Sequence, residues 1–147
     1  MTSSELIQIA TSLIGSLCFG ILFNMRGKRL IAAAVGGLLS WGLFVVLSHF
    51  ILNEPINYFI VAAVVSLYSE IMARILKTPA APIVTTSLIP LIPGGSLYYT
   101  MSSAFESNFT MFLEKAVSTL KLACALALGI IVVTAISQFL FKRVKQR

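Results

Sequence analysis

The chain has 147 residues, of which 58% are hydrophobic and 11% are charged. A soluble domain carries about 25% charged residues, so this composition excludes an ordinary soluble domain and predicts an integral membrane protein. The formal net charge of +6 does not indicate nucleic-acid binding, because the basic residues flank apolar runs and form no patch with interleaved aromatic side chains.

The first half of the chain contains three apolar runs. Residues 6–25 and 30–53 carry no charge, and each reaches the roughly 20 residues that a helix needs to cross a bilayer. Residues 56–76 form a third span, which carries Glu70 and Arg74 near its end. Charged residues inside a span are rare and mark sites of interest.

Glu70 and Arg74 are four residues apart, in the order that favours an ion pair along one helix face. One interpretation is a structural pair, in which each charge lowers the cost of burying the other. The alternatives are a cytoplasmic gate or a protonatable Glu70 that couples transport to protons.

The fourth apolar run is interrupted. Residues 78–105 are uncharged, but two prolines and two glycines lie between Pro90 and Ser96. A continuous helix is incompatible with this composition, so we expect a fourth span over residues 82–105 that is broken at the Pro-x-x-Pro-Gly-Gly segment. In hydrocarbon, a break must face a cavity or a packed interface that satisfies its backbone groups. Many transporters build substrate sites from such breaks.

The residues after the break have the properties of an anion site. A half-helix that begins after Pro93 presents free N–H groups and the positive end of its dipole, which attract carboxylate or phosphate. Gly94 and Gly95 leave access to the backbone, and Ser96 can cap the helix. Hydroxyl groups nearby include those of Thr85, Thr86 and Tyr98. The alternative is a structural kink that neighbouring helices satisfy.

Positive charges decide the number of crossings. A last span covers residues 117–141, so a fourth span that crosses fully gives five crossings and a re-entrant one gives four. Five crossings place nine of the eleven Lys and Arg residues on one side, and cytoplasmic loops collect such residues. We therefore expect one transmembrane domain over residues 1–147, with about five helices, the N-terminus outside and the C-terminus in the cytoplasm.

Small residues recur every four positions on the first two spans, which lets helices approach closely. The two stripes are Ser12, Ser16 and Gly20, and Ala32, Gly36 and Ser40. The facing helix can belong to this chain or to another. Because a small protein with five spans has little material to enclose a pathway, we expect a partner subunit or an oligomer.

Several chemistries have no basis in the sequence. One histidine and two separated cysteines do not form a metal cluster, and neither a nucleophilic triad nor a phosphate-binding loop is visible. We expect no enzymatic activity and no cofactor.

Two segments resemble a known family. Residues 69–79 read Ser-Glu-Ile-Met-Ala-Arg-Ile-Leu-Lys-Thr-Pro, and residues 89–101 read Ile-Pro-Leu-Ile-Pro-Gly-Gly-Ser-Leu-Tyr-Tyr-Thr-Met. The chain resembles the threonine/serine exporter family, and in length and span layout it is similar to the short subunit that corresponds to the C-terminal half of the fused exporters. The motif positions that match are Pro90, Pro93, Gly94 and Tyr98.

The resemblance implies export of threonine/serine-like amino acids or dicarboxylates, driven by protons, together with a larger subunit that resembles the N-terminal half of the family. We place the exporter in the bacterial plasma membrane. The apolar spans contact the lipid bilayer, and the small size of the chain makes a homo-oligomer an alternative to assembly with that subunit. No nucleic acid partner is expected. The alternative function is a non-transporting membrane scaffold or assembly partner.

Overall fold

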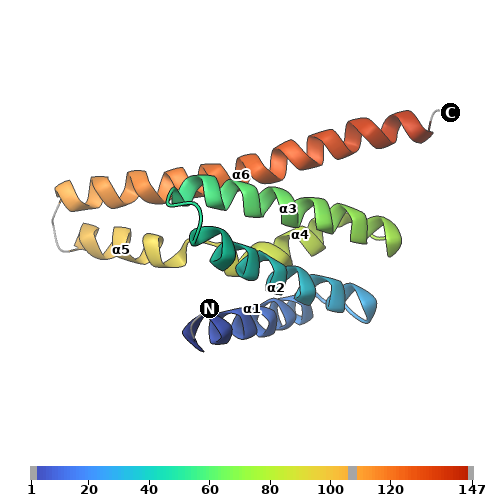
Figure 1. Cartoon of the computed structure of the whole chain (residues 1–147), viewed down its shortest axis with the longest axis horizontal. Coiled ribbons are helices and arrows are strands. Elements are labelled where there is room, and N and C mark those ends of the chain that lie inside the picture. The colour runs from blue at the N-terminus through green and yellow to red at the C-terminus, as the bar shows by residue number, and fades with distance from the viewer. Residues whose placement is uncertain (1–2, 106–108, 146–147) are drawn as a thin grey trace.

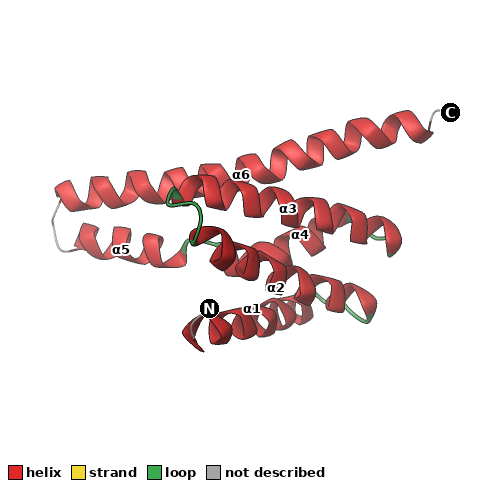
Figure 2. Ribbon diagram, in the orientation of Figure 1, coloured by secondary structure: helices red, strands yellow, loops and turns green. Residues whose placement is uncertain are grey.

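The computed structural model describes residues 3–105 and 109–145, and in these ranges all regular structure is helical (Figure 2). The helices are α1 (Ser3–Leu22), α2 (Lys28–Ser48), α3 (Glu54–Ile75), α4 (Ala80–Leu88), the 3-10 turn η1 (Ile89–Leu91), α5 (Gly94–Phe105) and α6 (Phe109–Lys145). The prediction of an all-α membrane protein is confirmed.

Four of these helices, α1, α2, α3 and α6, are long and apolar enough to cross a membrane. Residues 80–91 and 94–105 form a bent pair that makes a fifth candidate span, with an angle of 60° between its two parts. The break lies where the sequence predicts it. Pro90 lies in η1 and Pro93 directly precedes α5. Proline lacks the N–H group that would continue a helix, and its fixed φ suits the start of the next one.

The helices form a layered bundle (Figure 1). α2 packs between α1 and α3, α6 packs on α3, and α4 contacts both α2 and α3. α5 extends away from α4 and packs along the first part of α6 (Figure 1). The broken pair therefore links two packing environments, the centre of the bundle and a hairpin with α6.

Most of the basic residues lie at one end of the bundle. Figure 1 shows the turn between α1 and α2, the end of α3 and the C-terminal end of α6 on the right, and the start of α6 on the left. The α1–α2 turn carries Arg26, α2 begins with Lys28 and Arg29, and Lys77 follows α3. The broken pair leads from the end where α3 ends to the end where α6 begins (Figure 1), which favours five crossings.

The small-residue stripes pack within this chain. Ser16 and Ser40 are fully buried, and a Cβ atom added to Gly37 would collide with the Ser16 side chain. A Cβ atom on Gly36 would lie 2.7 Å from the Cβ of Ser87 and 3.2 Å from the ring of Tyr68. The glycines of α2 therefore let α1, α3 and α4 approach closely, as small residues do in membrane proteins.

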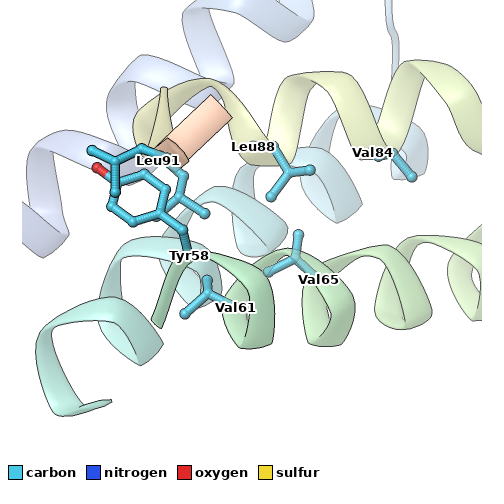
Figure 3. Close-up of a cluster of buried hydrophobic side chains, with 7 residues drawn as sticks. Tyr58, Val61, Val65, Val84, Leu88 and Leu91 are labelled. Atoms are coloured by element: carbon cyan, nitrogen blue, oxygen red, sulfur yellow. The ribbon is translucent and has the colours of Figure 1, made fainter. Parts of the chain in front are cut away.

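A buried apolar cluster fixes the break against α3. Leu91 is fully buried and lies beside Tyr58 and Val61, as Figure 3 shows. Val84 and Leu88 of α4 belong to the same cluster, which Leu122 of α6 completes. The cluster holds the α4 side of the break, and α5 is held separately by its packing on α6.

The longest helix extends beyond the predicted last span of residues 117–141. α6 has 37 residues, so it is about 55 Å long, whereas the hydrocarbon core of a bilayer is about 30 Å thick. Glu114 and Lys115 lie within its first turns. Charged residues end the apolar stretch of a span, but they do not end a helix, which explains the difference.

Candidate functional site

A groove with a volume of about 640 Å³ runs along α4, between α3 and α6. One part of its lining is polar, with Glu70 of α3, Thr85 of α4, and Thr134 and Gln138 of α6. The other part is apolar and is lined by Leu88, Ile89, Ile92, Leu126 and Ile130. The groove therefore joins the intramembrane carboxylate to the break, because Ile92 lies between the two prolines.

The polar part of the groove contains an ion pair. The Oε2 atom of Glu70 lies 3.3 Å from Nη2 of Arg74, one helical turn further along α3. The Glu70 side chain is 15% exposed and that of Arg74 is 37% exposed. Among the described residues that line the groove, Glu70 alone is charged. The predicted pairing is present, with the carboxylate towards the groove and the guanidinium nearer to the surface.

The first turn of α5 is open. Apart from the adjacent residues and the backbone of α5 itself, no described atom lies within 4 Å of the position that a Cβ atom would take on Gly94 or on Gly95. The N–H groups of Gly95 and Ser96 lie in the first turn, where a helix supplies no carbonyl partner. The Gly94 N–H donates to the Ile92 carbonyl at 2.7 Å, which tightens the turn before α5. This helix start is thus accessible to a ligand.

The other predicted site residues lie in different environments. Thr86 is fully buried, and its hydroxyl lies 3.7 Å from Sδ of Met25, on the side of α4 that faces α1. Pro90 lines a smaller cavity of about 250 Å³ beside α1 and Trp41. Tyr98 is 68% exposed and makes an edge contact with Tyr99. Of the predicted site residues, Glu70 lines the groove. The predicted residues of the break, Pro90 and those from Pro93 to Tyr98, do not line it and lie at or beyond the point where it ends.

Two polar residues of the groove, Thr134 and Gln138, are absent from the sequence-based site. Thr134 and Gln138 continue a stripe with Leu126 and Ile130, four residues apart along α6. Two polar residues four positions apart in an otherwise apolar helix indicate a polar face, so the sequence could have predicted this part of the groove. Thr85 belongs to the hydroxyl residues before the break, but the sequence does not distinguish it from the adjacent Thr86, which has the same side chain.

The arrangement can perform two kinds of chemistry. A carboxylate in a mostly apolar groove can bind a cationic group. The start of α5 can donate backbone hydrogen bonds to an anion. Among the described residues no group of three His, Cys, Asp or Glu side chains is placed to hold a metal ion.

The comparisons with known proteins agree with the resemblance. Residues 8–136 match the family model described as Threonine/Serine exporter, ThrE. Searches among curated proteins and among solved structures gave no match. The family match covers α2 to α5 completely and most of α1 and α6, and it includes both Glu70 and the break.

Proposed function

Because the chain belongs to the threonine/serine exporter family, a family of membrane transporters, we propose that it is a subunit of a secondary exporter for small carboxylate-bearing solutes. The solutes are threonine/serine-like amino acids or dicarboxylates, and they leave the cell in exchange for protons. The protein lies in the bacterial plasma membrane, and the basic end of the bundle faces the cytoplasm.

The observation that carries this proposal is the groove from Glu70 to Ile92. Its volume of about 640 Å³ lies within the range of about 300–1,000 Å³ that is usual for small-molecule sites. It combines apolar walls with a few polar groups, and one end meets a break in a membrane helix. Transporters bind their substrates at breaks of this kind.

Each part of the groove has a role in the proposal. Glu70 carries the coupling proton, and Arg74 is its ion-pair partner. Thr85, Thr134 and Gln138 hydrogen-bond to the solute as it passes. The open N–H groups at Gly95 and Ser96 receive the carboxylate beyond the break, next to Tyr98.

A larger partner subunit completes the pathway. The exposed face of α5 supports this part of the proposal, because Tyr98, Tyr99 and Phe105 are 68%, 61% and 84% exposed. A half-helix with open backbone donors requires a polar neighbour inside a membrane. The partner supplies that neighbour and the opposite wall of the pathway.

Efflux of labelled threonine, serine and succinate tests the proposal in cells that carry this chain, the partner, or both. We expect export only with both subunits, and we expect export to depend on the pH gradient. Export by the partner alone at the full rate would mean that this chain is a scaffold.

A further inference from the structure

A second cavity, of about 700 Å³, lies where α1 ends, α2 begins and α4 begins. Arg26 and Arg29 line it, together with Asn24 and Thr78. This cavity is separate from the groove, although Pro79 contributes to the walls of both. The proposed transport pathway assigns no role to it.

The two arginines give the cavity an uncompensated positive charge. Both side chains are exposed, and neither forms an ion pair with another described residue. No acidic residue appears among the described residues of the lining. By contrast, Arg74 near the same end of the bundle is paired with Glu70. Two guanidinium groups in one cavity match the geometry of a phosphate or carboxylate group.

Neutral donors surround the arginines. The Asn24 amide and the Thr78 hydroxyl line the same cavity. α2 and α4 both start beside it, and their N-cap residues, Gly27 and Pro79, provide no side-chain cap. The free N–H groups of both helices add positive potential to that of the guanidinium groups.

The flank of the cavity is apolar. Phe23 lines it and is 53% exposed, and the preceding Leu22 is 76% exposed. Both residues lie at the end of α1, a candidate span, so the cavity lies at the level where the span meets the membrane surface. An anionic group at this level, with apolar side chains next to it, has the layout of a phospholipid headgroup above its acyl chains.

We propose that this cavity binds the phosphate group of an anionic phospholipid, with Arg26 and Arg29 on the phosphate and the acyl chains along Leu22 and Phe23. The proposal is independent of transport, because the site and its readout involve lipid binding alone.

Native mass spectrometry of the purified full-length chain tests the proposal, with phosphatidylglycerol and phosphatidylcholine as probes. The variant combines Arg26→Gln and Arg29→Gln, two exposed positions where neutral side chains leave the packing intact. The control combines Lys115→Gln and Lys121→Gln, which removes the same charge from the first half of α6. Size-exclusion profiles and circular dichroism establish that all three proteins are folded.

We expect the native chain to prefer phosphatidylglycerol. The arginine variant loses about 25-fold in affinity for this lipid, or about fivefold per arginine, and binds phosphatidylcholine as before. The control changes by less than about twofold. Inorganic phosphate and succinate at millimolar concentration do not displace the lipid. Equal lipid preference in the native chain and the arginine variant, or an equal loss in the control, would overturn the proposal. Displacement by phosphate or succinate would also overturn it, because the cavity would then serve a free anion.

Discussion

The carboxylate of Glu70 lies in the wall of the groove, while its partner Arg74 reaches the surface. Arg74 lies in the last turn of α3 with 37% of its side chain exposed, so its guanidinium can extend to water at the membrane surface when the pair is broken. The pair therefore contributes about 1 kcal/mol or less to stability. We therefore expect Glu70→Gln to leave membrane abundance near normal and to abolish pH-dependent efflux. Immunoblots at matched expression and efflux at several external pH values measure the two effects. Normal efflux with unchanged pH dependence would remove Glu70 from the coupling step, and low abundance would mark the pair as structural.

Thr85 and Thr86 are adjacent on α4 but have different surroundings. Thr85 lines the groove, whereas Thr86 is fully buried beside Met25. Thr85→Val keeps the shape of the side chain and removes a hydroxyl from the pathway. We expect efflux to fall about fivefold, because one hydrogen bond contributes about 1 kcal/mol. Thr86→Val removes only a weak contact with sulfur and serves as the matched variant. A larger loss of efflux with Thr86→Val than with Thr85→Val would contradict the assignment of the groove.

Glycine is required on α2 only at positions where a neighbouring helix packs directly against the backbone. Gly36 faces Ser87 and Tyr68, whereas Gly42 on the same helix has no described atom within 4 Å of an added Cβ. Gly36→Ala should destabilise the protein by about 1–3 kcal/mol through overpacking. Gly42→Ala should stabilise it by up to about 1 kcal/mol, because alanine favours the helix. Thermal unfolding of the purified variants in detergent measures both effects. Similar stability of the two variants would show that α2 does not pack as described.

The break between α4 and α5 supplies both an opening and a bend. Because the space around Gly94 and Gly95 is open, Gly94→Val and Gly95→Val should fold normally. Either valine blocks the approach of a carboxylate to the α5 N–H groups. We expect efflux to fall about tenfold or more, as for a lost hydrogen bond to a charged group.

Pro93→Ala tests the bend at the same place. It restores a backbone N–H group and allows α4 and α5 to straighten from their 60° angle, so it should impair efflux as well. All three variants are compared at equal membrane abundance with the partner present. Normal efflux in both valine variants would make the break a structural kink and exclude the anion site.

The sequence predicts the break better than the groove, for a physical reason. Proline and glycine act on the backbone at their own position, so the end of α4 and the start of α5 follow from Pro90, Pro93 and Gly94. The groove depends on how α4 is rotated against its neighbours. With hydroxyls on both Thr85 and Thr86, the sequence pattern of α4 does not reveal which face meets α6. The rotation of α4 is determined by the packing of Leu88 and Leu91 against α3.

The whole bundle has a polarity that can be tested. The α1–α2 turn and the C-terminal end of α6 lie at one end, and the α2–α3 connection lies at the other (Figure 1). Since cytoplasmic segments collect basic residues, the end that carries Arg26 and Lys28 should face the cytoplasm. This orientation places the polar part of the groove on the side from which an exported solute enters.

Cysteine labelling of intact cells determines this orientation. Cys18 and Cys124 are exposed, so both are first replaced by alanine. Single cysteines are then introduced at Lys28, at Leu52, which is 97% exposed in the α2–α3 connection, and at Gln146. An impermeant thiol reagent should modify only the cysteine at position 52, and disruption of the membrane should expose the other two. Labelling of position 146 but not position 28 in intact cells would mean that the pair of α4 and α5 turns back within the membrane. The protein would then have four crossings, and the groove would not connect the two sides.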